Sequence, residues 1–172
     1  MRRWLTAAAG LSILFAAASP APAVARDSLG VFDRWGAFRD PQVPRCYAIA
    51  QPDNVRGRRQ YRAFASIGYW PKRGVRGQFH LRLSRAMAKA GDATLTIGVR
   101  RFALTGGGGD AWAKDKAMDA AIIAAMRSAR QMTVSADGAD GKTIRDVYLL
   151  KGAATALDAA ALGCAATRQR NS

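Results

Sequence analysis

A strict alternation of apolar and polar residues is the feature of this sequence that most restricts its fold. Phe79, Leu81 and Leu83 are separated by His80 and Arg82. A period of two residues is that of a β-strand with one face in a core and the other in solvent. The segment therefore predicts a half-buried strand whose outer face is basic.

Several further segments predict strands or the turns between them. Gly and Asp in 137–141 supply the turn of a hairpin, and a change of phase after Ile97 indicates a turn or bulge at 98–101. Loops are expected at 51–59, which has no apolar rhythm, and at the four glycines 106–109. The expected strands are 31–38, 46–50, 62–70, 78–84, 94–97, 102–104, 132–134 and 144–150.

Two segments predict short helices. Residues 115–130 carry an apolar stripe at helical spacing, with Asp near the start and Arg near the end, and residues 153–162 are rich in Ala. We interpret Met118 and Met126 in that stripe as core residues. The order of elements favours a mainly β single domain, a β-sandwich with two helices, over a doubly wound sheet.

Residues 1–25 predict a secretory signal peptide. Arg2 and Arg3 precede an uncharged apolar run, which ends in small residues and prolines. Cleavage is expected after Ala25, or two residues earlier before Val24. An uncleaved anchor is the alternative, but the run is shorter than the ~20 apolar residues that span a bilayer. No later segment is long enough to do so. Residues 26–172 would form one periplasmic or secreted domain.

The cysteines of the expected mature chain are Cys46 and Cys164. Export to an oxidising compartment allows them to form a disulfide, which would close a long loop. The alternative is that each is a separate buried thiol that packs as a small apolar side chain. On a terminal helix, Cys164 shares a face with Leu157 and Ala161, and that face is the one expected to be buried.

Four short segments of the sequence match the pattern of a known protein family. They are 32–35, Cys46–Gln51, Met132–Ser135 and Leu150–Asp158. Together they resemble the invasion-associated locus B family of exported alphaproteobacterial proteins. The resemblance implies an immunoglobulin-like β-sandwich, an envelope or secreted location, and a non-enzymatic role in host interaction. Members commonly pair the equivalent of Cys46 with a Cys soon after Trp35; this chain has none at 36–39, which leaves Cys164.

Basic residues dominate the charge of the chain. Lys and Arg number 27 against 12 acidic residues, all of them Asp, which gives a formal net charge of +15. The stretch 54–91 contains no acidic residue. Its arginines, which are suited to bidentate contacts with phosphate or carboxylate, predict an anion-binding face. They are Arg56, Arg58, Arg59, Arg62, Arg73, Arg76, Arg82 and Arg85, accompanied by Lys72 and Lys89.

Three aromatic residues among these cations, Tyr61, Tyr69 and Trp70, are expected to stack on sugars. The expected ligand is an anionic envelope polymer such as lipopolysaccharide, or an acidic or host-surface glycan. Nucleic acid is the weakest candidate because no nucleic-acid-binding motif is present. In a simpler interpretation the basic stretch is solvated surface and the aromatics belong to the core. The protein would then bind a protein partner through an apolar patch.

The sequence contains no motif of an enzyme active site or metal site. Its single histidine, His80, lies in the basic strand, and no zinc-protease or paired-Cys motif is present. The glycines at 106–109 are not followed by the Lys and Ser or Thr of a phosphate-binding loop. Asp110 and Asp146 are marginal candidates for a catalytic role. We therefore predict a non-enzymatic protein without a metal or other cofactor.

Overall fold

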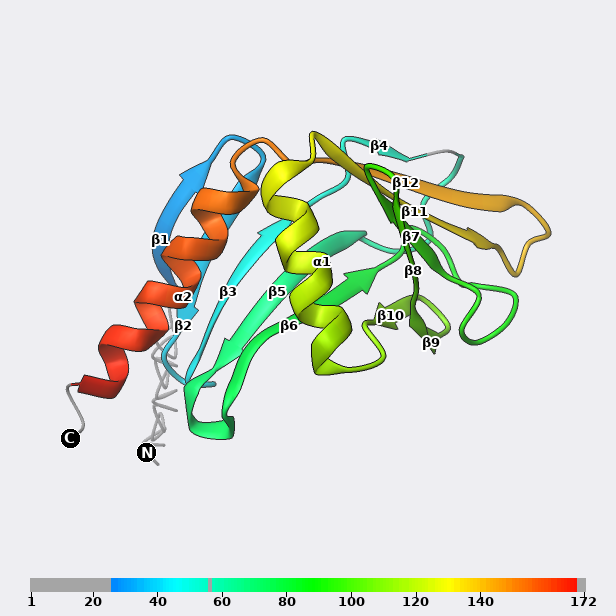
Figure 1. Ribbon diagram of the computed structural model, residues 1–172. Coiled ribbons are helices and arrows are strands. Elements are labelled where there is room, and N and C mark those ends of the chain that lie inside the picture. The colour runs from blue at the N-terminus through cyan, green and yellow to red at the C-terminus, as the bar shows by residue number, and fades with distance from the viewer. Residues whose placement is uncertain (1–25, 56, 170–172) are drawn as a thin grey trace, which may run out of the picture.

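Two antiparallel β-sheets and two α-helices form the part of the chain described by the computed structural model, residues 26–55 and 57–169 (Figure 1). The expected signal peptide, residues 1–25, and Arg56 lie outside the described residues. None of the described helices has the length and hydrophobicity needed to cross a membrane. The prediction of a mainly β chain with two helices is confirmed.

The larger sheet has seven strands in the order β1-β2-β3-β5-β6-β10-β9. Along β5 and β6, residues such as Ile67, Phe79 and Leu81 alternate with half-buried or exposed ones, so one face of the sheet is buried and the other is open. The strands are β1 (Asp27–Phe32), β2 (Trp35–Asp40), β3 (Arg45–Ala50), β5 (Phe64–Trp70), β6 (Val75–Arg82), β9 (Thr105–Gly107) and β10 (Asp110–Trp112).

The smaller sheet has five strands in the order β4-β12-β11-β7-β8. Its centre is the predicted hairpin, in which Val134 pairs with Asp146. Val134 and Ile144 are buried, whereas Thr94 and Ser135 are half-buried on the opposite face. The strands are β4 (Asn54–Val55), β7 (Thr94–Ile97), β8 (Arg100–Ala103), β11 (Gln131–Asp137) and β12 (Thr143–Leu149).

Both helices pack on the same face of the seven-stranded sheet (Figure 1). Helix α1 (Lys116–Ser128) begins after Asp115, whose carboxylate accepts a hydrogen bond from the Met118 amide at 2.8 Å. The Asp119 carboxylate accepts a hydrogen bond from the Phe79 amide of β6 at 2.8 Å, which joins α1 to the sheet. Helix α2 (Ala153–Gln169) crosses β1, β2 and β3. The predicted helix at 153–162 is therefore longer than expected.

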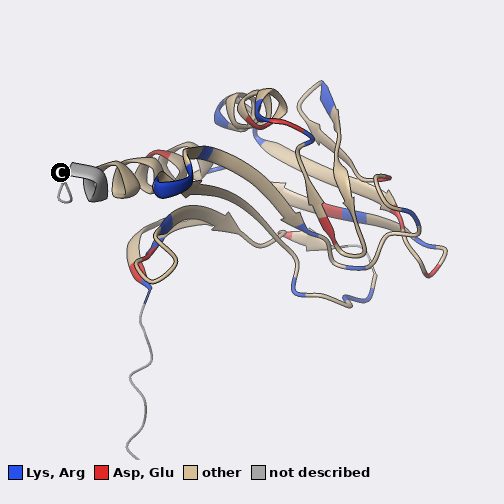
Figure 2. Ribbon diagram, turned by 90° about the horizontal axis from the view of Figure 1, so that it is seen from below, with Lys and Arg blue, Asp and Glu red and all other residues tan. Residues whose placement is uncertain are grey.

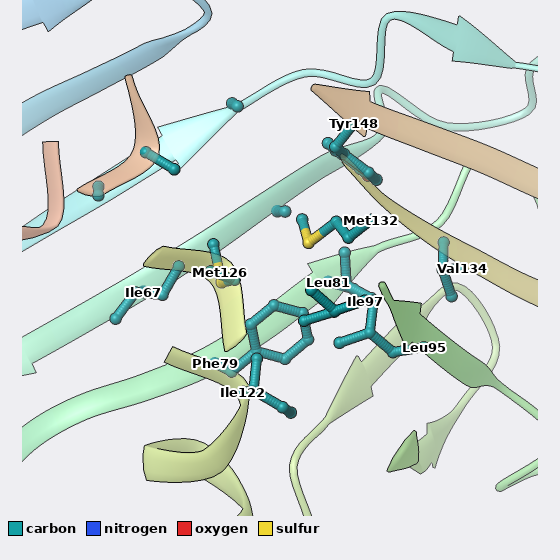
Figure 3. Packing of buried hydrophobic residues seen from close by; sticks show 14 of the residues in the cluster. Ile67, Phe79, Leu81, Leu95, Ile97, Ile122, Met126, Met132, Val134 and Tyr148 are labelled. Carbon is teal, nitrogen blue, oxygen red and sulfur yellow. The ribbon is translucent and has the colours of Figure 1, made fainter. Parts of the chain in front are cut away.

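The main core lies between the two sheets and α1. Figure 3 shows Phe79 and Leu81 of β6 facing Leu95 and Ile97 of β7, with Met132 of β11 beside them. Ile122 and Met126 of α1 close the same core, which confirms the helical stripe as core. The five-stranded sheet and the helices thus share one face of the larger sheet. The other face of that sheet, here called the free face, carries Phe38, Phe64, His80 and Trp112.

Three expectations about local structure are wrong. The expected loop 51–59 contains the short strand β4, which pairs with β12. The predicted strand 31–38 is a hairpin, because Asp33 adopts a left-handed conformation (φ 57°) and turns β1 back onto β2. The predicted flexible loop at 106–109 contributes to the β9–β10 hairpin. A Cβ on Gly106 would lie 2.1 Å from the Asp110 carbonyl oxygen, so the glycine allows the two strands to approach closely.

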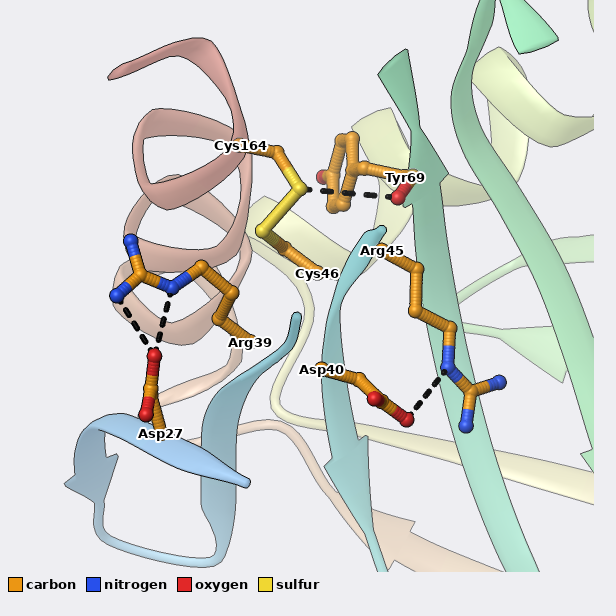
Figure 4. The surroundings of a disulfide bond; sticks show 7 residues. All are labelled: Asp27, Arg39, Asp40, Arg45, Cys46, Tyr69 and Cys164. Carbon is orange, nitrogen blue, oxygen red and sulfur yellow. Dashed lines mark hydrogen bonds and ion pairs between the residues drawn. A yellow bond between two sulfur atoms is a disulfide. The ribbon is translucent and has the colours of Figure 1, made fainter. Parts of the chain in front are cut away.

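Cys46 and Cys164 form a disulfide, as one of the two alternatives predicted. The bond joins β3 to α2, with a Cα–Cα distance of 5.7 Å, and spans 118 residues of sequence. Figure 4 shows it beside Tyr69 of β5, with the Arg39–Asp27 and Arg45–Asp40 ion pairs nearby. The disulfide therefore fastens α2 covalently to the middle of the seven-stranded sheet.

Candidate anion-binding surface

The predicted basic face is divided between two ends of the β5–β6 hairpin. Arg58, Arg59 and Arg62 are exposed in the loop that precedes β5, whereas Arg73 and Arg76 are exposed at the turn between β5 and β6. The intervening strand β5 has seven residues, which corresponds to roughly 20 Å. Figure 2 likewise shows the basic positions spread over the fold rather than gathered in one patch.

Arg85 is buried rather than exposed. The residue is 6% exposed, and its guanidinium donates to Asp140 at 2.6 Å and to the Thr143 carbonyl oxygen at 2.7 Å. The same guanidinium lowers the pKa of Asp140, after the larger effect of the Lys142 amide. Arg85 therefore joins the end of β6 to the β11–β12 hairpin and is not part of an open binding face.

Arg82 belongs to a polar and aromatic cluster on the free face. Its guanidinium pairs with Asp110 and lies 4.1 Å from the centre of the Tyr61 ring. Asp110 also lies 3.0 Å from His80 Nε2, and the His80 ring stacks on Trp112 with centroids 4.8 Å apart. The Arg82 guanidinium is thus already engaged by Asp110 and by the Tyr61 ring.

The cluster has a histidine and a carboxylate but no engaged nucleophile. Ser66 is the cross-strand neighbour of His80 in β5, yet no hydrogen bond joins the two side chains. Among the described residues, no three His, Cys or Asp side chains lie close enough together to hold a metal ion. The geometry of the cluster is that of a packed surface held by the Arg82–Asp110 ion pair and the His80–Asp110 hydrogen bond.

Tyr69 and Trp70 point to opposite faces of β5. Tyr69 pairs with Cys46 and lies on the helix side, where burial raises the pKa of its phenol, with Arg127 and Asp158 as nearby charges. Trp70 lies on the free face, and a Cβ on Gly68 would meet its ring at 2.3 Å. The two rings therefore cannot serve one ligand.

A groove of about 820 Å³ lies beside the basic loop. Phe38 and Phe64 supply apolar surface, and Arg26, Arg34 and Arg62 supply positive charge. Arg34 is paired with Asp53 at 3.2 Å. Arg62 and Arg26 form no ion pair with another described residue, so their guanidinium groups are available at the edge of the groove.

A smaller hollow of about 300 Å³ lies on the other side of the loop. It is lined by Arg58, Arg59, Gln60 and Asp140, together with Arg85. Arg58 and Arg59 are exposed and form no hydrogen bond or ion pair within the described chain. The loop 57–62 therefore presents three exposed guanidinium groups between the groove and the hollow.

A buried carboxylate lies behind this loop. Asp146 of β12 is fully buried and accepts two hydrogen bonds from Ser84, at 2.8 Å from the amide and 2.6 Å from the hydroxyl. Burial raises the pKa of Asp146, while Ser84 and the positive charge of Arg85 and Arg59 act in the opposite direction. Asp146 joins the two sheets, which gives this marginal catalytic candidate a structural role.

Sequence reasoning missed the groove. Gly36, Phe38 and Ile49 alternate with buried residues of β2 and β3, so their outward orientation follows from the period of two. Their proximity to Phe64 and Arg62 follows only from the pairing of β3 with β5, which spans a loop. The sequence pattern therefore indicated which side chains are exposed, but it did not indicate that they lie together in one groove.

Comparisons with known proteins return no relative: no family model, curated protein or solved structure matches the chain. The resemblance to the invasion-associated locus B family therefore depends on the four short segments and stays a prediction.

Proposed function

We propose that this protein is an exported, non-enzymatic binding protein that docks an anionic envelope polymer through the loop 57–62. The ligand class is lipopolysaccharide or an acidic glycan, including host-surface glycans. The observation that carries the proposal is the set of three exposed arginines, Arg58, Arg59 and Arg62, that have no ion-pair partner among the described residues. Guanidinium groups in this state bind phosphate or carboxylate without first breaking an internal pair.

The neighbouring groove supports a glycan rather than a free ion. Phe38 and Phe64 offer half-buried ring surface next to Arg62. Sugar rings pack on aromatic faces, while their acidic substituents require cations. The groove and the loop therefore match the two chemical parts of an acidic glycan.

The proposal includes the wider assignment made from the sequence. We propose export after cleavage near Ala25, which the Cys46–Cys164 disulfide supports because such bonds persist in oxidising compartments. We also propose membership of the invasion-associated locus B type and an immunoglobulin-like sandwich. Two stacked antiparallel sheets with a shared core support the sandwich.

Retention on immobilised lipopolysaccharide over a salt series tests the proposal, with a neutral dextran as the control matrix. Binding through phosphates is expected to weaken steeply between ~50 and ~200 mM salt. The triple variant Arg58→Glu, Arg59→Glu, Arg62→Glu is expected to elute at much lower salt than the unmodified protein. Thermal unfolding of the variant establishes that it remains folded.

A matched variant separates a local site from bulk charge. Lys72→Glu, Arg73→Glu, Arg76→Glu changes the net charge equally at the far end of the β5–β6 hairpin. Its retention is expected to stay close to that of the unmodified protein. Equal losses in the two triple variants would show that only net charge matters, and an unaffected loop variant would refute the site.

A protein partner is the second candidate function. Val31 is 71% exposed, belongs to the edge strand β1, and lines the groove. An extended partner segment could pair with such an edge and place an apolar side chain in the groove. Salt-insensitive binding that is lost in Val31→Asp would favour this function over polymer docking.

A further inference from the structure

A second polar site lies on the outer face of the five-stranded sheet, away from the basic loop. A hollow of about 420 Å³ is present there. We call it the hydroxyl hollow, because four side-chain hydroxyls and two guanidinium groups line it. These residues are Thr94, Thr96, Thr133, Ser135, Arg101 and Arg145. Neither the sequence interpretation nor the proposed docking function uses any of these residues.

The strand register arranges these groups in two rows across the sheet. One row runs Arg101, Thr96, Thr133 through β8, β7 and β11, and the other runs Thr94, Ser135, Arg145 through β7, β11 and β12. Partners in adjacent strands lie about 5 Å apart, and successive outward residues of a strand lie about 7 Å apart. The two arginines therefore stand at opposite ends of a block of four hydroxyls.

All six side chains lack a polar partner in the described part of the chain. No hydrogen bond, ion pair or ring contact involves the four hydroxyls or the two guanidinium groups. Thr133 is the most distinctive of them, because it is only 7% exposed and yet its hydroxyl bonds to no protein group. The hydroxyl is not among the buried unpaired polar atoms of the described residues, so it is open to the hollow, where water or a ligand can bond to it.

Charge and geometry together favour one class of ligand. Two guanidinium groups match the charge of a phosphate monoester, which is −1.5 to −2 at neutral pH. Hydroxyls both donate and accept, so they match phosphate oxygens and sugar hydroxyls equally well. Asp137 lies further along the same face of β11, but it does not line the hollow.

We propose that the hydroxyl hollow binds a phosphate monoester carried on a hydroxylated ring, such as a sugar phosphate. Arg101 and Arg145 bind the phosphate, and the Thr and Ser hydroxyls bind its remaining oxygens and the ring hydroxyls. This proposal is independent of the polymer docking proposed for the loop 57–62. The shared chemistry covers a free sugar phosphate and the phosphorylated sugar of a glycolipid.

Titration calorimetry and amide chemical shifts test the site with three probes: glucose 6-phosphate, inorganic phosphate and glucose. Glucose 6-phosphate is expected to bind most tightly and to shift amides of β7, β8, β11 and β12. Inorganic phosphate is expected to bind more weakly, and glucose is expected not to bind. Equal affinity for inorganic phosphate and glucose 6-phosphate would overturn the role of the ring. Shifts confined to loop 57–62 would overturn the site.

Variants provide the decisive comparison. Arg101→Gln with Arg145→Gln is expected to raise the Kd for glucose 6-phosphate by about tenfold or more, since charge-assisted hydrogen bonds are lost. The matched pair Arg73→Gln with Arg76→Gln makes the same change of charge elsewhere and is expected to leave the Kd nearly unchanged. Equal effects of the two pairs would overturn the proposal.

Thr133→Val removes the hydroxyl of this largely buried residue while preserving its shape. The variant is expected to fold with unchanged or slightly higher stability, because no protein hydrogen bond is lost, and to bind glucose 6-phosphate several-fold more weakly. Unaltered binding would remove Thr133 from the site. Retention on lipopolysaccharide by the loop arginines is a separate measurement, so failure of one proposal does not imply failure of the other.

Binding to vesicles distinguishes a free sugar phosphate from the phosphorylated sugar of a glycolipid as the ligand of the hydroxyl hollow. Vesicles of phosphatidylcholine with a phosphorylated glycolipid are expected to capture the protein, and vesicles of phosphatidylcholine alone serve as the control. Excess glucose 6-phosphate is expected to reduce capture by the glycolipid vesicles. Capture that is unaffected by glucose 6-phosphate but lost in the loop variant would exclude the glycolipid as the ligand of the hydroxyl hollow.

Discussion

The open faces of the two sheets differ in how their polar groups are satisfied. On the free face of the seven-stranded sheet, Asp110 bridges His80 and Arg82, and His80 stacks on Trp112. On the outer face of the five-stranded sheet, four hydroxyls and two guanidinium groups have no protein partner. The first face therefore contributes to the stability of the fold, whereas the second keeps its hydrogen-bonding capacity for solvent or a ligand.

The two sheets also differ in how they are joined to the rest of the molecule. The seven-stranded sheet is bonded covalently to α2 through Cys46 and Cys164. The five-stranded sheet is held by apolar packing and by side-chain hydrogen bonds that Ser84 donates to Asp146 and Arg85 donates to Asp140. Mutations at these points test whether the two regions are stabilised as independently as their contacts suggest.

Removal of the disulfide is expected to have the largest effect. Cys46→Ala with Cys164→Ala should lower the free energy of unfolding by about 4 kcal/mol, because the unfolded chain is no longer constrained by a loop of 118 residues. Chemical denaturation measures the loss, and hydrogen exchange should show α2 opening before the five-stranded sheet. A loss of protection first in β11 and β12 would contradict the comparison.

Removal of the buried carboxylate is expected to have the next largest effect. Asp146→Ala should destabilise the fold by about 2–3 kcal/mol, because the Ser84 amide loses its hydrogen-bond partner in a buried position. Urea denaturation at neutral pH measures this change. Asp146→Asn is the control, since its amide can still bond to Ser84, and it should cost much less than the alanine variant.

The raised pKa of Asp146 predicts how stability depends on pH. A carboxyl group whose pKa is higher in the folded state than its ordinary 3.8 binds protons more tightly when folded. Its contribution to stability is therefore largest at low pH and declines as the pH rises through the folded pKa. Asp119, whose pKa is also raised by burial, contributes in the same direction.

Denaturation of the Asp146→Asn variant over a pH series tests this sign. The variant should gain stability relative to the unmodified protein as the pH rises above 4. Asp140 and Asp158, whose pKa values are lowered by their hydrogen bonds, act in the opposite direction in both proteins and cancel in the difference. A difference that shrinks with rising pH would show that Asp146 is stabilised as a carboxylate.

The smallest effects compare the two open faces directly. Trp112→Ala should destabilise the fold by about 1–2 kcal/mol, because the stack on His80 and the associated apolar contact are lost. Thr96→Val on the other face should change stability by less than about 0.5 kcal/mol, since its hydroxyl has no protein partner. Thermal unfolding of both variants is sufficient, and a larger effect for Thr96 would reverse the comparison.

Local periodicity was enough to predict much of the secondary structure. The alternation around Phe79 predicted β6, and the Asp and Gly residues at 137–141 predicted the β11–β12 turn. The turn at Asp33 was missed because a non-glycine residue in the left-handed conformation leaves no strong sequence signal. The four glycines suggested flexibility, although Gly106 is required by a close strand contact.

The candidate sites depended on pairing between distant strands. The basic stretch predicted exposed Arg58, Arg59 and Arg62, but it could not show that Arg85 is buried against Asp140, whose position is far along the chain. The hydroxyl hollow brings together β7, β8, β11 and β12. Each hydroxyl alone resembles an ordinary outward residue of a half-buried strand, so only the strand order reveals the site.

The position of Cys164 in the chain has a consequence for maturation and for proteolysis. Cys164 follows all twelve strands of the described residues, so the disulfide can close only after every one of these strands has been synthesised. Disulfide formation therefore comes late relative to synthesis, and it then fixes α2 against β3. A protease that cuts any loop between residues 46 and 164 produces two pieces that stay linked until a reductant separates them.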